Sequence, residues 1–152
     1  MSETLLRDDD LIVRSDGGLR RITLNRPQAL NAITLDMAVA MTALLREWQS
    51  DQKVGAVLLD GAGERGFCAG GDIRALYEAA QSATVSAVDA LPARFWAIEY
   101  RLNVLIARYA KPIIAVMDGL VMGGGVGLSA HAAHRVVTER SAVAMPEVSI
   151  GF

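Results

Sequence analysis

The sequence of 152 residues contains a single cysteine, Cys68, and only two lysines, Lys53 and Lys111. One cysteine excludes an internal disulfide and cannot build a thiolate metal site. The formal net charge is −2, so no basic surface predicts nucleic-acid binding. No apolar run reaches the roughly 18 uncharged residues of a membrane span, so we expect no membrane partner. The acidic start MSETLLRDDD differs from a signal peptide, which predicts a cytoplasmic location.

Glycine, in contrast, is concentrated in two clusters. MGGGVGLSAHAAH (122–134) holds four glycines within five positions, and FCAGGDI (67–73) holds two more. Glycine supplies no side chain to pack and loses much conformational entropy on folding, so its concentration in apolar sequence needs a reason. Each cluster follows an apolar run, VGAVLLD or IIAVMDG, and precedes a helical pattern.

The spacing of apolar residues predicts one domain in which strands and helices alternate, an α/β layered fold. Met37, Met41, Leu44, Leu45 and Trp48 share one face of the first expected helix. The predicted elements, in chain order, are a hairpin over 11–24, a helix from Thr34 as its cap to about Ser50, a strand buried on both faces at 54–60, a short helix from Asp72 to Tyr77, a helix over 88–109, a second buried strand in 113–119, a loop entering a helix at 123–131, and short extended segments at 135–139 and 141–145.

Two glycine loops that each lead into a helix can aim backbone N–H groups at one point, because the first N–H groups of a helix have no partner within it. Two such donors converging on one oxygen form an oxyanion hole, which stabilises charge on a carbonyl or thioester oxygen. The alternative is that the glycines serve ordinary tight loops. Spacing alone does not separate these two interpretations.

A third glycine pattern, GAGERG at 61–66, matches the G-x-G-x-x-G spacing of dinucleotide-binding loops. That fingerprint requires a helix to start within it, so that the pyrophosphate meets the helix N-terminus. Here FCAGG follows, and its two glycines delay any helix. We therefore expect neither a nicotinamide nor a flavin cofactor.

Five segments resemble, in order, the motifs of the enoyl-CoA hydratase/isomerase (crotonase) superfamily: LNRPQALNAI (24–33), FCAGGDI (67–73), KPIIAVMDG (111–119), MGGGVGLS (122–129) and MPEVSIG (145–151). The resemblance implies a spiral of ββα turns that binds acyl-CoA. It also implies that residues 1–152 form the N-terminal part of one such domain, truncated before its C-terminal helical region.

Carried over by position, the resemblance assigns roles to individual residues. The backbone N–H groups of Gly71 and Gly124 would form the oxyanion hole. The channel for the adenine and pantetheine parts of the substrate would be lined by Ala69, Gly70 and Ile73, with Leu30 and Ala32 nearby as further substrate-binding residues.

The reaction class is suggested by a difference from the family's hydratases. Those enzymes resemble one another in a G-G-G-x-E motif, whereas Gly127 stands here in place of the glutamate. Hydration needs two carboxylates to position water and move its proton, and only Glu147 is visible. The motifs most resemble the 3-hydroxyisobutyryl-CoA hydrolase subfamily of valine degradation, in which a glutamate at this position and an aspartate in a following F-P-D run carry the chemistry. There, a glutamate before a tyrosine, here Glu99-Tyr100, contacts substrate.

The resemblance therefore implies a thioester hydrolase with Glu147 as catalytic residue and Glu99 as substrate-binding residue, and with no metal or separate cofactor. Read without the resemblance, Glu147 is equally a carboxylate that caps a loop. Glu99, beside Arg101 in a helical pattern, equally lies on a solvated helix face even with the resemblance. Structural roles are the preferred reading for the remaining candidates, namely a helix cap for Asp72, a small buried side chain for Cys68, and no chemistry for His131 and His134.

Three functions stay open: an acyl-CoA thioester hydrolase, another crotonase-fold enzyme such as an isomerase with one glutamate, and a non-catalytic acyl-CoA-binding or interaction module. The sequence ends at Phe152, before the F-P-D run would appear. Strands as apolar as VGAVLLD need cover on both faces. We therefore expect association with a missing C-terminal segment or a homo-oligomer.

Overall fold

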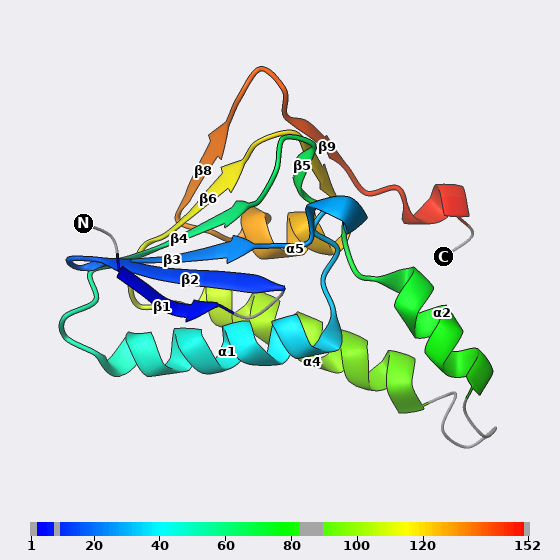
Figure 1. Cartoon of the computed structure of the whole chain (residues 1–152), viewed down its shortest axis with the longest axis horizontal. Helices are drawn as coiled ribbons and strands as arrows, with labels where there is room; N and C mark the ends of the chain where they lie inside the picture. The colour runs from blue at the N-terminus through cyan, green and yellow to red at the C-terminus, as the bar shows by residue number, and fades with distance from the viewer. Residues whose placement is uncertain (1–2, 8–9, 83–89, 151–152) are drawn as a thin grey trace.

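The computed structural model describes residues 3–7, 10–82 and 90–150, which form two sheets and the helices packed against them (Figure 1). The larger sheet has six strands in the order β1 (Glu3–Arg7), β2 (Leu11–Asp16), β3 (Leu19–Leu24), β4 (Ala56–Gly61), β6 (Ile113–Met117) and β8 (His134–Val137). The smaller sheet has the order β5 (Gly66–Cys68), β7 (Leu120–Met122) and β9 (Ala142–Ala144).

The chain winds through both sheets as a spiral. Antiparallel pairing joins β1, β2 and β3, and the expected hairpin over 11–24 is confirmed. From β3 onward the larger sheet is parallel, and the smaller sheet is parallel throughout. Each of β4, β6 and β8 is followed along the chain by its counterpart β5, β7 or β9 in the smaller sheet. A helical segment follows each pair, so the predicted spiral of ββα turns is confirmed.

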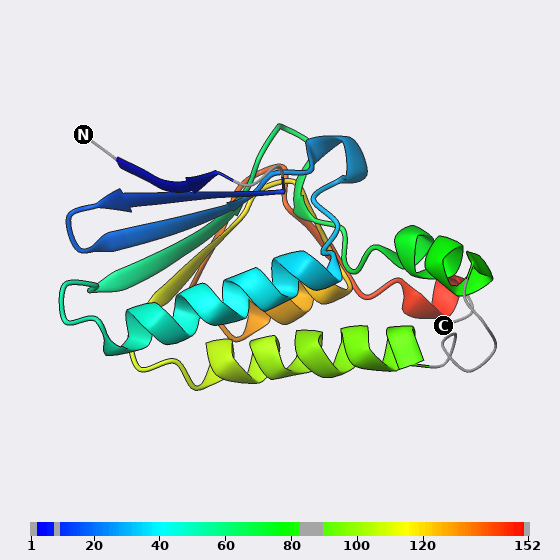
Figure 2. The same ribbon diagram turned by 60° about the horizontal axis from the view of Figure 1, so that its bottom comes forward.

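Helix α1 (Leu35–Ser50) begins as the sequence predicts, because the Met37 N–H donates to Thr34 Oγ1 at 3.1 Å. Its apolar face packs into the core, with Leu44 partly buried and the other members fully buried, namely Met37, Met41, Leu45 and Trp48. Figure 2 shows α1 and α4 (Ala90–Ala107) side by side on one face of the larger sheet. These two helices bring the second half of the chain against the first.

The expectation of strands buried on both faces is wrong for the larger sheet. In β4, Val57 and Leu59 are buried under the helices, whereas Leu58 on the opposite face is only partly buried. The reason is that α1 and α4 lie on the same side (Figure 2). At the edges, β8 and β9 are exposed along their whole length.

Other element boundaries differ modestly from expectation. The short helix after Asp72 is longer than predicted, since α2 spans Ile73–Ser82. The predicted 88–109 helix corresponds to α4, and residues 88 and 89 lie outside the described residues, as do 151 and 152 at the end of the last motif. GAGERG runs from the end of β4 to the start of β5 with no helix inside it, so the helix-start geometry of a dinucleotide loop is not present there. None of the helices in the described part is long and apolar enough to cross a membrane.

Candidate active site

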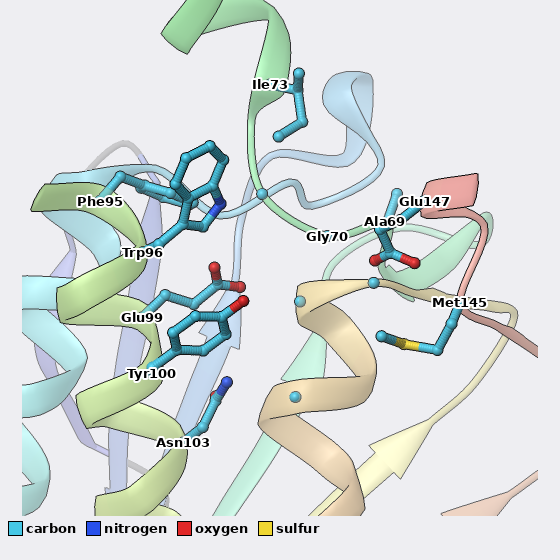
Figure 3. Close-up of a pocket in the computed structure, with 14 residues that line it drawn as sticks. Ala69, Gly70, Ile73, Phe95, Trp96, Glu99, Tyr100, Asn103, Met145 and Glu147 are labelled. Carbon is cyan, nitrogen blue, oxygen red and sulfur yellow. The ribbon is translucent and has the colours of Figure 1, made fainter. Parts of the chain in front are cut away.

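A pocket of about 340 Å³ lies where the two glycine loops, α4 and the segment after β9 meet (Figure 3). It brings together most of the predicted site residues from four separate parts of the sequence. The lining is made of Ala69, Gly70, Gly71, Ile73, Phe95, Trp96, Glu99, Tyr100, Asn103, Gly123, Gly124, Gly127, Met145 and Glu147.

Leu30 and Ala32 do not line this pocket. They belong instead to the support of the first glycine loop, because the Leu30 carbonyl accepts the N–H of Ala69 at 3.0 Å. The Asn31 side chain between them donates to the carbonyls of Ala62 and Gly66, both at 2.9 Å. Contact of either residue with the CoA part of a substrate stays a prediction.

The first glycine loop (69–72) is held by backbone hydrogen bonds to Ile33, a residue distant in sequence. The Ile33 N–H donates to the Gly70 carbonyl at 2.8 Å, and the Asp72 N–H donates to the Ile33 carbonyl at 2.9 Å. Asp72 caps α2 as predicted, since its Oδ1 accepts the Ala75 N–H at 3.0 Å. Its other oxygen pairs with Arg26 at 2.8 Å. The loop between these bonds presents Gly71 to the pocket.

The second glycine loop turns directly into α5 (Gly124–Ala130). Gly123 has φ +51° and ψ −119°, a conformation that residues with a β-carbon rarely adopt. A β-carbon on Gly124 would collide with the Glu99 carboxylate and would lie 3.4 Å from the Gly71 nitrogen. These glycines are therefore needed because other groups of the pocket approach the backbone closely.

The N–H groups of Gly71 and Gly124 are available to a ligand in the part of the chain that the structure describes. Neither donates a hydrogen bond to a protein acceptor there, whereas the neighbouring N–H groups do: Gly70 donates to Cys68 Sγ and Gly123 to the Ala144 carbonyl. Two backbone donors without a protein acceptor therefore line one pocket.

Glu147 reaches the pocket because β9 pairs with β7. The register places Met122 opposite Ala144, so the chain leaving β9 passes over the start of α5. A β-carbon on Gly123 would lie 2.6 Å from Glu147 Oε1, which places the carboxylate beside this loop. Figure 3 shows the Glu147 carboxylate pointing toward the start of α5. Glu147 is partly buried, so water can still reach it.

Glu99 is 5 % exposed and points from α4 toward the same place, so the alternative of a solvated helix face is wrong (Figure 3). Burial raises the pKa of the Glu99 carboxyl, and the negative charge of Glu147 raises it further. Two carboxyl groups of unequal environment thus face each other across the pocket. Such pairs are typical of sites that move protons.

A pH-dependent stability is expected from Glu99. Because its pKa is higher in the folded than in the unfolded chain, the stabilising contribution is complete below the ordinary glutamate pKa and is lost as the pH rises through the raised value. The glutamine in Glu99→Gln cannot ionise. The melting temperature of this variant, relative to that of the wild type, should therefore rise progressively from pH 4 to pH 8. The melting temperatures of both proteins are measured by circular dichroism across this pH range. The matched control is Glu47→Gln on the exposed face of α1, and parallel curves for wild type and Glu99→Gln would contradict the expectation.

Several of the residues that line the pocket were not predicted from the sequence. Phe95, Trp96 and Asn103 come from α4 and lie three or four positions from Glu99, and Tyr100 directly follows Glu99. That spacing was the available signal, because residues three or four positions from a pocket residue share its helix face. Met145, on the approach to Glu147, had no comparable signal.

Other candidates from the sequence lie outside the pocket lining. His131 and His134 are exposed. Cys68 is fully buried, and burial raises the pKa of its thiol to about 12, so it stays protonated and unreactive. The prediction of a small buried side chain is confirmed for Cys68. Within the described ranges, no group of three or more His, Cys, Asp or Glu side chains gathers as a possible set of metal ligands.

Comparison with known proteins agrees with this geometry. Residues 19–152 match the family of enoyl-CoA hydratase/isomerase. Among curated relatives, "3-hydroxyisobutyryl-CoA hydrolase, mitochondrial" of Danio rerio is 48 % identical over 131 residues, which cover 86 % of this chain and 33 % of that protein. "Small ribosomal subunit protein mS47" of Neurospora crassa is 42 % identical over 144 residues, covering 95 % and 28 %. The chain thus spans about a third of the length of these relatives.

A solved structure, described as a carnitinyl-CoA dehydratase from Mycobacterium thermoresistibile, superposes with a TM-score of 0.88 at 51 % identity. The match covers 95 % of this chain and 41 % of that one. The curated relatives also correct one expectation. The cytoplasmic location predicted from the sequence is contradicted, because the relatives named 3-hydroxyisobutyryl-CoA hydrolase, from Danio rerio and Gallus gallus, are named as mitochondrial.

Proposed function

The chain belongs to the enoyl-CoA hydratase/isomerase family, and we propose that the intact protein containing it hydrolyses an acyl-CoA thioester, with 3-hydroxyisobutyryl-CoA as substrate and a role in valine degradation. One observation carries the proposal. The pocket sets two unpartnered backbone N–H groups, from Gly71 and Gly124, beside the Glu147 carboxylate, while position 127, where a second hydratase carboxylate would stand, is glycine.

In the proposed reaction the thioester oxygen binds to the N–H groups of Gly71 and Gly124. As water adds to the carbonyl carbon, negative charge develops on that oxygen, and the two donors stabilise it in the transition state. The Glu147 carboxylate takes the proton of the attacking water. The tetrahedral intermediate then collapses by breaking the carbon–sulfur bond, and the thiol of coenzyme A leaves with a proton. Ala69, Gly70 and Ile73 line the same pocket, and the CoA part of the substrate would lie along them.

Hydration of an enoyl-CoA is the second candidate, since the solved neighbour is described as a dehydratase. It needs a second proton-transfer group near the water, and Glu99 is the available one because it faces Glu147 across the pocket. A role without catalysis is the third, because one relative of 42 % identity is named as a ribosomal protein.

Assay of the intact protein separates the three. We expect free thiol to be released from 3-hydroxyisobutyryl-CoA, followed with a colorimetric thiol reagent, and little change in the enoyl absorbance of crotonyl-CoA. Rapid hydration of crotonyl-CoA with little thiol release would contradict the proposal in favour of a hydratase. Binding of acyl-CoA with neither reaction would favour the third function.

The same proposal includes further protein that packs against the exposed edge strands β8 and β9. Val136 and Val137 on β8 and Val143 on β9 are exposed, and each of these strands is the edge of its sheet. Exposed valines on edge strands favour burial by further protein. We propose that a following segment or a second copy of the protein covers them. Light scattering of the intact protein would distinguish a monomer from an oligomer.

A further inference from the structure

Asn103 lies one helical turn beyond Glu99 on α4 and lines the same pocket. Its Oδ1 atom is buried and has no hydrogen-bond partner among the described residues. A buried acceptor without a donor is unfavourable, and protein interiors contain few of them. Figure 3 shows the Asn103 side chain pointing from α4 toward α5. Asn103 as a whole is only partly buried and lines the pocket, so a small turn of its side chain would bring this acceptor to a bound molecule that supplies the missing donor.

Gly127 on α5 faces this amide directly. A β-carbon at position 127 would lie 2.6 Å from Asn103 Nδ2 and 3.2 Å from Asn103 Oδ1. The Asn103 amide thus fills the space that a side chain at position 127 would need. A primary amide does not gain or lose a proton at neutral pH, so it cannot move a proton as a carboxylate would. It can position a polar group by hydrogen bonding.

We propose that Asn103 is a specificity-determining residue that recognises a hydroxyl group on the acyl chain of the substrate, with Oδ1 accepting the hydroxyl proton. The placement rests on the proposed function, because the thioester oxygen at Gly71 and Gly124 directs the acyl chain into the space between α4 and α5. A hydroxylated acyl group satisfies the buried acceptor. An acyl group without the hydroxyl leaves it unpaired, and sites built to bond a hydroxyl discriminate strongly against such analogues.

The first test compares two substrates that differ by one oxygen, 3-hydroxyisobutyryl-CoA and isobutyryl-CoA. Asn103→Leu keeps the side-chain size and removes the acceptor. We expect the wild-type preference for the hydroxylated thioester, measured as the ratio of kcat/KM values, to fall roughly tenfold or more in this variant. The loss of kcat/KM should be larger for the hydroxylated substrate than for isobutyryl-CoA. Val104→Leu, on the exposed side of α4, is the matched control.

A second variant reaches the same atom from the opposite helix. In Gly127→Ala the new methyl group displaces the Asn103 amide, so the preference should fall as in Asn103→Leu. Adding Gly127→Ala to Asn103→Ala should then change nothing further, because the amide is already absent. This cycle also keeps the proposal testable if Asn103→Leu does not fold.

Binding separates this proposal from the proposed hydrolase activity. Thioether analogues of the two substrates cannot be hydrolysed, and their dissociation constants are measured by calorimetry on the intact protein. Absence of thiol release from every acyl-CoA would end the hydrolase proposal, and the Asn103 proposal would still predict tighter binding of the hydroxylated analogue, lost in Asn103→Leu. Equal binding of the two analogues by the wild type, binding of neither, or a preference unchanged in both variants would overturn it.

Discussion

Replacing Glu147 by glutamine is expected to lower kcat for thioester hydrolysis roughly 10²- to 10⁴-fold, the usual contribution of a positioned general base. Glutamine keeps the shape of the side chain but cannot accept a proton from water. Since Glu147 contributes no hydrogen bond to the described fold beyond its local backbone, the variant should remain folded. The measurement is steady-state thiol release from 3-hydroxyisobutyryl-CoA by the intact protein.

The dissociation constant of a thioether analogue should change little in Glu147→Gln, because the lost interaction acts mainly in the transition state. Glu139→Gln, an exposed glutamate near the same part of the chain, is the control for loss of a carboxylate. A rise in KM with kcat unchanged would instead identify Glu147 as a binding residue.

Two substitutions of Gly124 should differ strongly from each other. Alanine and proline both place a β-carbon against the Glu99 carboxylate, but only proline removes the backbone N–H. Gly124 is the first residue of α5, a position at which proline is well tolerated. If this N–H stabilises the oxyanion, Gly124→Pro should be less active than Gly124→Ala by about 10²- to 10³-fold in kcat, or about 2.7–4 kcal/mol in the barrier.

The comparison is made on kcat for 3-hydroxyisobutyryl-CoA, with circular dichroism spectra of both variants to check folding. The difference between the two variants matters here, since the collision with Glu99 lowers the activity of each. Equal activities in two folded variants would remove the Gly124 N–H from the oxyanion hole.

Much of the fold follows from local patterns. The hairpin over 11–24, the Thr34 cap of α1 and the apolar strands at β4 and β6 are determined by residues close in sequence, so they were predictable. The family motifs added the spiral of ββα turns. The gathering of Gly71, Gly124 and Glu147 at one pocket agrees with the roles that the motifs implied.

The environment of individual side chains was decided by tertiary structure. Glu99 has the sequence surroundings of a solvated helix, yet α4 packs against α5 and buries it at the pocket. Asn103 is remote in sequence from Gly127, and only the approach of these two helices leaves its Oδ1 buried without a donor. Leu30 and Ala32 belong to a family motif, and the loop that contains them supports the first glycine loop by a backbone hydrogen bond.

The sequence by itself therefore determined the hairpin over 11–24, the apolar strands β4 and β6 and the start of α1, because these depend on turn residues, a helix cap and apolar residues a few positions apart. The depth at which each carboxyl or amide lies depends on which helix packs over it. This depth is set by contacts between residues far apart in the chain. Here the packing of α4 against α5 buries Glu99, which raises its pKa, and places Asn103 in the lining of the pocket.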